Sequence, residues 1–87
     1  MIILNIKNKE LFLRANKAIT LDKDTSKMLS IMANRRRTTS RELAKEVYGS
    51  SIRFPYIWAN IRFLKQYLNI YSDFNGYKLL DKIYITY

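Results

Sequence analysis

Apolar residues in segment 54–69 recur with the period of an α-helix. They are spaced by four, three and four residues and so form one stripe (Ile57, Ile61, Leu64 and Leu68). The opposite face carries small, aromatic, amide and cationic side chains but no carboxylate (Pro55, Tyr56, Ala59, Arg62, Phe63 and Gln66). Pro55 fits the first turn, where its missing N–H costs no hydrogen bond. We therefore expect a helix over residues 54–69, with one buried face and one face suited to a negatively charged surface.

Two shorter helices are predicted before this segment. Asp22 is a favourable N-cap, and Asp24 suits the first turn of a helix that runs to about Asn34. The inner face of this helix is mostly apolar (Thr25, Met28, Leu29 and Met32). The next helix opens with a capping box, in which Thr39 can accept from the amide of Glu42 and Glu42 can reach back. Gly49 is expected to end it, and its inward residues are apolar (Leu43, Ala44 and Val47).

Strand patterns flank the predicted helices. Three segments rich in β-forming residues are separated by polar turns and predict an antiparallel meander (2–6, 11–13 and 18–21). Asn75-Gly76 is a strong hairpin signal, and the runs on either side of it read as strands (70–72 and 77–80). Residues 83–87 alternate and predict a further strand, which could close the N-terminal sheet or pair with another chain.

This order of elements predicts an α+β fold, a winged helix-turn-helix with N-terminal antiparallel strands, three helices and a C-terminal β-hairpin wing. A chain of 87 residues can form one hydrophobic core. We expect a single domain over residues 1–87, divided into N-terminal strands (1–21), a three-helix core (22–69), and a wing with a terminal strand (70–87). In such a domain the third helix enters the major groove of DNA and the wing reaches the backbone or the minor groove.

The net charge of +9 is concentrated in the middle of the chain. Residues 34–65 hold eight basic and two acidic side chains, whereas the charges in residues 66–87 balance. Charge that is both large and segregated favours a polyanionic partner, and we expect nucleic acid. The alternative is a basic protein without such a partner, kept soluble by its charge.

The chain has no cysteine and no histidine. This composition excludes a disulfide framework and a thiolate zinc site, and it removes the usual general base. The carboxylates are accounted for by caps, pairing and turns, and they do not cluster as a metal-dependent nuclease requires. We expect no enzymatic activity, no cofactor and no metal. The absence of a signal-peptide pattern and of a membrane-spanning run predicts a soluble cytoplasmic protein, associated with the nucleoid.

Four motifs in order resemble the DNA-binding (effector) domain of OmpR/PhoB-type response regulators and their ToxR-like relatives, from about Leu4 to Leu80. The motifs are Leu21-Asp22-x-x-Thr25-x-x-Met28-Leu29-x-x-Met32, Thr39-x-x-Glu42-Leu43…Val47-Tyr48-Gly49, Ile61-x-x-Leu64-Lys65-x-x-Leu68 and Gly76-Tyr77-Lys78-Leu79. The resemblance implies a sequence-specific, bacterial transcriptional regulator that binds duplex DNA, with a possible homodimer on repeated half-sites and a possible contact with RNA polymerase.

The chain departs from the family pattern at several positions. Thr25 replaces a glutamate, and Phe63 stands where family members often place a base-reading arginine. The loop from Gly49 to Ile57 is shorter than usual. In the family that loop often touches RNA polymerase, so the departure places activation by that route in doubt.

The predicted DNA contacts lie on the third helix, at the start of the second, between the first two, and in the wing. Arg62, in the middle of the exposed face, is the first choice for a base or phosphate contact, and Ala59 could meet a thymine methyl group. Asn60 lies where family members place a contact residue. Trp58 is expected to pack, with a phosphate hydrogen bond as its alternative. The full set is Arg35, Arg36, Arg37, Thr39, Ser40, Arg41, Arg53, Tyr56, Ala59, Asn60, Arg62, Phe63, Lys65, Gln66, Asn75 and Lys78.

Two other functions remain open. A winged-helix protein–protein module would use the aromatic residues Tyr56, Trp58 and Phe63 to bind another regulator or a polymerase. A plasmid or phage replication initiator would bind DNA at iterated sites, with the same chemistry as a promoter regulator. RNA is less favoured, because a helix placed in the major groove suits B-form DNA.

Overall fold

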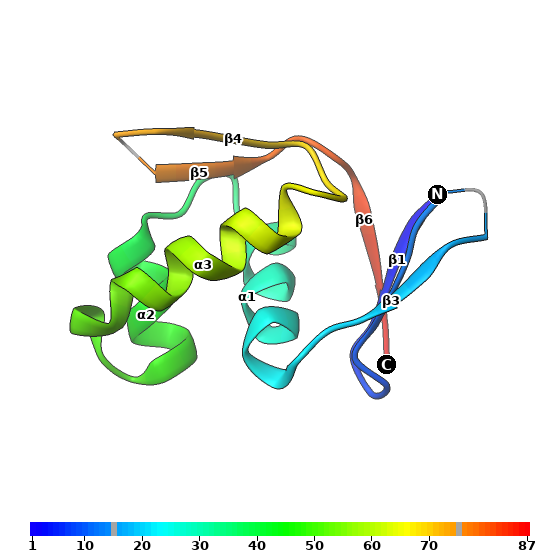
Figure 1. Cartoon of the computed structure of the whole chain (residues 1–87), viewed down its shortest axis with the longest axis horizontal. Helices are drawn as coiled ribbons and strands as arrows, with labels where there is room; N and C mark the ends of the chain where they lie inside the picture. Colours follow the sequence, from blue (N-terminus) through cyan, green and yellow to red (C-terminus); the bar gives the residue numbers. More distant parts are fainter. Residues whose placement is uncertain (15, 75) are drawn as a thin grey trace.

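Three helices lie between a four-stranded sheet and a separate two-stranded hairpin in the computed structural model, which describes residues 1–14, 16–74 and 76–87 (Figure 1). The helices are α1 (Lys23–Asn34), α2 (Ser40–Tyr48) and α3 (Phe54–Leu64), and a short 3₁₀ turn, η1 (Ser51–Arg53), precedes α3. The fold is therefore α+β, as the order of patterns predicts.

The predicted caps of the first two helices are confirmed. The Asp22 carboxylate accepts from the Thr25 amide at 2.7 Å at the start of α1. At the start of α2 the Thr39 hydroxyl accepts from the Glu42 amide at 3.1 Å and donates to the Glu42 carboxylate at 3.0 Å. Glu42 thus reaches back to the hydroxyl of Thr39. Gly49 ends α2 in the left-handed conformation, with φ 77°.

The apolar stripe of α3 is buried, but the helix ends at Leu64 rather than at Asn69. The predicted C-terminal boundary is wrong for two reasons. The backbone tightens after Leu64, since the Tyr67 amide donates to the Leu64 carbonyl, three residues back, at 3.0 Å. The Asn69 amide then donates to the Asp81 carboxylate at 2.8 Å, which replaces a helical acceptor. Leu68 still packs in the core through this turn, with 4% of its surface exposed.

The four-stranded sheet joins the two ends of the sequence. Its strands are β1 (Ile2–Asn5), β2 (Glu10–Phe12), β3 (Ala18–Thr20) and β6 (Ile83–Thr86), in the order β3-β2-β1-β6. The first three form the predicted antiparallel meander. β6 pairs with β1 in parallel, with Ile2 opposite Ile83. The sequence allowed residues 83–87 either to close the N-terminal sheet or to pair with another chain. In the structure this strand closes the N-terminal sheet.

The hairpin consists of β4 (Ile70–Asp73) and β5 (Gly76–Leu79), as predicted. The expected turn residue Asn75 lies outside the described residues. β5 is attached to the α1–α2 connection by a pair of backbone hydrogen bonds: the Thr38 amide donates to the Tyr77 carbonyl at 3.0 Å, and the Tyr77 amide donates to the Thr38 carbonyl at 2.6 Å. The hairpin also lies beside α3 (Figure 1).

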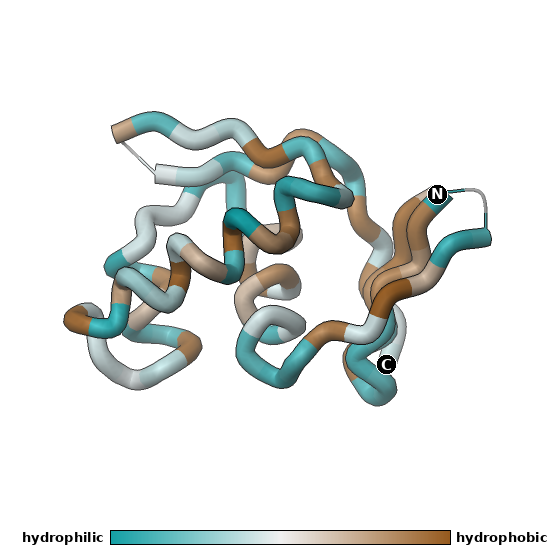
Figure 2. The backbone as a smooth tube through the Cα atoms, in the orientation of Figure 1, coloured by the Kyte–Doolittle hydropathy of each residue, from teal (hydrophilic) through white to brown (hydrophobic). Residues whose placement is uncertain are grey.

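The core lies between the helices and the inner face of the four-stranded sheet. Figure 2 shows apolar segments gathered in the sheet and alternating with polar ones along α3. The buried apolar residues come from the three helices, from β1, β2 and β4, and from two connections (Ile2, Leu4, Leu11, Leu21, Met28, Leu29, Met32, Leu43, Ala44, Ile57, Ile61, Leu64, Leu68 and Ile70). No helix within the described ranges is long and apolar enough to cross a membrane.

Candidate nucleic-acid interface

The outer face of α3 is exposed along its length. The residues predicted to point away from the core are all solvent-exposed (Pro55, Tyr56, Ala59, Arg62, Phe63 and Gln66). Arg62 supplies a positive charge within the helix, and Lys65 follows at its C-cap. Neither side chain forms an ion pair with a carboxylate of the described residues. The two charges thus remain available to a ligand.

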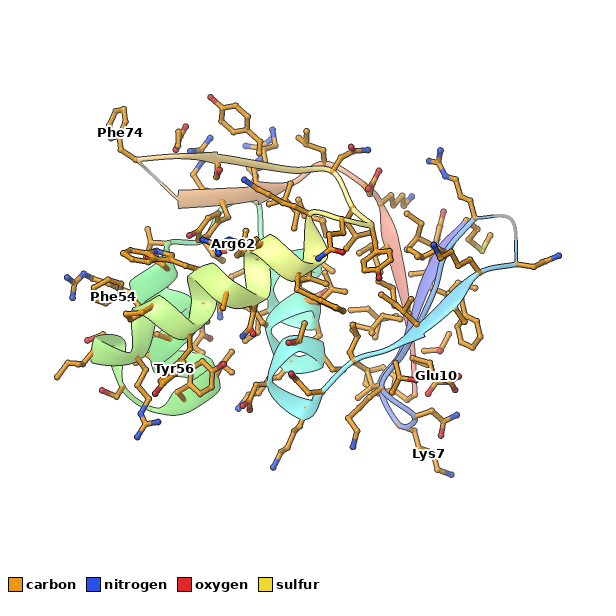
Figure 3. The ribbon with its side chains drawn as sticks, in the orientation of Figure 1. Lys7, Glu10, Phe54, Tyr56, Arg62 and Phe74 are labelled. Carbon is orange, nitrogen blue, oxygen red and sulfur yellow. The ribbon has the colours of Figure 1, made fainter. Side chains whose placement is uncertain are left out.

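A groove separates α3 from the hairpin. We call it the helix–hairpin groove; it has a volume of about 220 Å³ and is lined by Trp58, Ile61, Arg62, Lys65, Ser72 and Tyr77. Arg62 projects from α3 on the side of the hairpin (Figure 3). The Lys65 ammonium donates to the Ser72 hydroxyl at 2.9 Å and so links the two sides. An indole N–H, a guanidinium, an ammonium and a hydroxyl are all donors, which suits phosphate oxygens.

The alternation of the hairpin determines which of its residues meet this groove. Ser72 and Tyr77 are directly opposite each other and share a face with the buried residue Ile70. Tyr71 and Lys78 form the next pair and lie on the other face. The predicted contact Lys78 is therefore exposed but directed away from the groove. Asn75, the other predicted wing contact, lies outside the described residues.

The start of α2 touches the hairpin. Burial raises the pKa of the Tyr77 phenol above its ordinary value, and the Ser40 hydroxyl at the start of α2 opposes that shift. Thr39 uses its hydroxyl in the helix cap, and the buried hydroxyl of Thr38 has no hydrogen-bond partner among the described residues. Of the contacts predicted at this helix start, Thr39 thus already holds structural hydrogen bonds.

The three consecutive arginines between α1 and α2 have different surroundings. Arg35 is paired with Glu46 of α2, and this guanidinium lowers the pKa of the Glu46 carboxyl. Arg37 donates to both carboxylate oxygens of Asp73 in the hairpin, at 2.8 and 3.0 Å. Arg36 is exposed and has no ion pair within the described ranges. Exposed ion pairs are weak, so a phosphate could displace Glu46 from Arg35 or Asp73 from Arg37. Arg36 could bind a phosphate without first losing a carboxylate partner.

Aromatic side chains surround the start of α3. The Arg41 guanidinium lies 4.6 Å from the ring centre of Phe54, and the Phe54 ring meets Trp58 at 5.0 Å and 68°. Phe54 and Tyr56 are labelled at this end of α3 in Figure 3. Trp58 keeps half of its surface exposed. It therefore packs, as predicted, and also presents an aromatic surface to solvent.

Three further predicted contacts lie on α3 or in the 3₁₀ turn before it. The Asn60 amide donates to the Tyr48 hydroxyl at 2.9 Å, so this side chain is held against α2. Arg53 lies over the ring of Tyr56, at 5.8 Å from its centre. Phe63 is 36% exposed and packs against Tyr67 with ring centres 5.6 Å apart. Asn60 would have to leave its partner to read a base, whereas Arg53 and Phe63 are exposed as they stand.

Neither Ser72 nor Tyr77 is among the contacts that the sequence predicts. Tyr77 packs against the core and also lines the helix–hairpin groove. The signal was present in the alternation of β4, since Ser72 falls two residues after the buried Ile70 and so on the same face. What the alternation alone does not show is that this face turns towards α3.

The described residues contain no group of three or more His, Cys, Asp or Glu side chains that could hold a metal ion. Comparison with protein-family models, with curated proteins and with solved structures gives no match for this chain.

Proposed function

We propose that this chain is a winged helix-turn-helix protein that binds duplex DNA sequence-specifically and regulates transcription. α3 would enter the major groove, and the β4–β5 hairpin would act as the wing on the backbone or in the minor groove. The supporting observation is the pairing of an exposed, carboxylate-free, cationic face of α3 with a hairpin that lines the same groove. The protein would act in the bacterial cytoplasm as a DNA binder without enzymatic activity.

The residues divide into base-reading and phosphate-binding groups under this proposal. Arg62 is placed to read a base edge or bind phosphate, and Ala59 permits close approach and contact with a thymine methyl group. Lys65 and Arg36 would bind phosphates. Gln66 follows the end of α3 and suits a backbone contact. A homodimer on repeated half-sites and a contact with RNA polymerase are further proposals that the family resemblance supports.

Salt dependence provides a quantitative test of the phosphate contribution. Neutralising about six phosphates gives a slope of about −5 in a plot of log K against log salt concentration. A slope shallower than about −2 would contradict binding through the phosphate backbone. The slope is measured by fluorescence anisotropy of a labelled duplex titrated at several salt concentrations.

Arg62→Ala tests the role of α3 in the same assay. Arg14→Ala is the matched control, because Arg14 is also an exposed arginine but precedes β3 in the four-stranded sheet. Arg62→Ala should weaken binding by about tenfold, in the range expected for a lost specific contact. Arg14→Ala should have a small effect through net charge alone. Equal effects of the two substitutions would contradict the placement of α3 in the major groove.

The second candidate function is a protein–protein module. It is favoured by the exposure of three aromatic side chains on α3, where Tyr56, Trp58 and Phe63 keep 54%, 50% and 36% of their surface. Such a module would bind in a salt-tolerant manner, tolerate Arg62→Ala and fail on Phe63→Ala. A replication initiator would behave as a DNA binder in these assays and differ by selecting iterated sites.

A further inference from the structure

The helix–hairpin groove has a floor that phosphate binding alone does not require. Ile61 is buried, with 3% of its surface exposed, and Tyr77 is half-buried, so these two form the floor. Arg62, Lys65 and Ser72 are exposed and form the rim. A phosphate needs only donors. An apolar and aromatic floor under a cationic rim is the combination found where proteins bind single-stranded nucleotides, with stacked bases and paired phosphates.

Trp58 lines this groove and is held in place by its neighbours. Its ring is braced by Phe54 in an edge contact, and Phe54 is itself covered by the Arg41 guanidinium. Half of the Trp58 surface nevertheless remains exposed. A ring that is already oriented loses little conformational freedom when a flat ligand stacks on it. The bracing therefore prepares an exposed aromatic surface next to the cations Arg62 and Lys65.

We propose that the helix–hairpin groove binds one unpaired nucleotide, with its base stacked on Trp58 and its phosphate held by Arg62 and Lys65. The proposal rests on the DNA-binding function proposed above and specifies the form of DNA that this site prefers. In a paired duplex the base faces are covered by their neighbours and only edges are presented in the grooves. A base must be unpaired or turned out of the stack to offer its face to Trp58.

The size of the groove limits its occupant. Its volume of about 220 Å³ lies below the 300–1,000 Å³ or so of drug-sized ligand pockets. It suits a single base rather than a run of stacked bases. The protein should therefore favour a duplex with one unpaired nucleotide over a fully paired duplex, and gain little from a long single strand.

Trp58 is the single tryptophan in the chain, so its intrinsic fluorescence reports on this groove without any substitution. Three probes of matched length are titrated: a paired duplex, the same duplex with one unpaired thymidine, and the single strand. The duplex with the unpaired thymidine should bind about tenfold more tightly than the paired duplex, which is the gain expected from one base stacked on an aromatic ring. It should also quench the Trp58 fluorescence more strongly. Equal affinity and equal quenching for both duplexes would overturn the proposal.

Substitution separates stacking from DNA flexibility in the same comparison. Trp58→Leu, read by anisotropy of labelled DNA, should remove the preference for the unpaired nucleotide, so that the paired duplex and the duplex with the unpaired thymidine bind with equal affinity. Tyr84→Leu, at an exposed aromatic residue on β6, is the control and should keep the preference. A preference that survives Trp58→Leu would overturn the proposal, because DNA deformability would then explain it.

The two proposals fail in distinguishable ways. If the paired duplex binds with a steep salt dependence but the unpaired thymidine adds nothing, duplex binding stands and the nucleotide site fails. If none of the three probes binds, both proposals fail. Should Trp58→Leu not fold, as judged by circular dichroism, the quenching measured on the unsubstituted protein still decides the question.

Discussion

Gly76 lies directly against the backbone of Thr38. A Cβ atom at position 76 would overlap the Thr38 carbonyl oxygen and would lie 2.9 Å from the Thr38 carbonyl carbon. Gly76 also has a φ of +123°, which side chains rarely adopt. The absence of a side chain therefore lets β5 approach closely enough for Tyr77 and Thr38 to exchange their two backbone hydrogen bonds.

Gly76→Ala should lower the free energy of unfolding by about 2–3 kcal/mol, because strained backbone and a steric overlap both act at this position. Gly49→Ala is the control, since Gly49 also has a positive φ of 77° but has no atom within 4 Å of an added Cβ. It should cost about 1 kcal/mol, from left-handed strain alone. Chemical denaturation measures both values. Equal costs would show that the approach to Thr38 does not constrain the fold.

Thr39→Ala should destabilise the protein by about 1 kcal/mol, the usual cost of a lost N-cap. The hydroxyl accepts from the Glu42 amide and donates to the Glu42 carboxylate, and alanine removes both bonds. Thr39→Ser keeps the hydroxyl and should stay close to the original stability. Thermal and urea unfolding of the two variants provide the comparison, and similar losses in both would assign the effect to the methyl group instead.

Tyr77 should make the protein sensitive to alkaline pH. Burial raises its pKa above the ordinary value of 10.0, so the folded state holds this proton more tightly than the unfolded state. The resulting stability is complete below about pH 10 and is lost as the pH rises towards the raised value. Tyr77→Phe should flatten the alkaline decline in unfolding free energy. Tyr71→Phe, at a half-exposed position on the other face of the hairpin, should leave the decline in place.

Asp73→Asn should increase affinity for duplex DNA under the proposed function. It removes the carboxylate that binds Arg37, so this arginine becomes free to contact a phosphate. The steepness of the salt dependence should rise by up to about one unit, for one added phosphate contact. Glu10→Gln is the control, because it makes the same change of charge on β2. If both variants change the binding equally, Arg37 makes no specific contact.

Local patterns predicted most of the elements, because caps and helix stripes depend on residues a few positions apart. The Asp22 cap, the stripe through Ile57 and Ile61, and the stop at Gly49 all occur where the sequence placed them. The 3.6-residue period of the apolar stripe also predicted which face of α3 is exposed. It did not predict where α3 ends, because that end depends on a hydrogen bond from the Asn69 amide to the distant Asp81.

Long-range contacts could not be derived from one sequence. Alternation predicted a strand in residues 83–87 but did not state its neighbour or its direction, since a strand offers hydrogen bonds along both edges. The same limit applied to the candidate site. The positions of Arg35 and Arg37 predicted a cationic cluster, whereas their pairing with Glu46 and Asp73 depends on how α2 and the hairpin pack.

The parallel pairing of β6 with β1 has a consequence for synthesis of the protein. Contacts between distant segments carry the largest loop-closure cost and tend to form late. While the chain emerges from the ribosome, β1 can pair with β2 along one edge. Its other edge has no partner strand until Ile83–Thr86 has been translated. The sheet is therefore completed only after translation has passed residue 86, and until then one edge of β1 has no strand beside it.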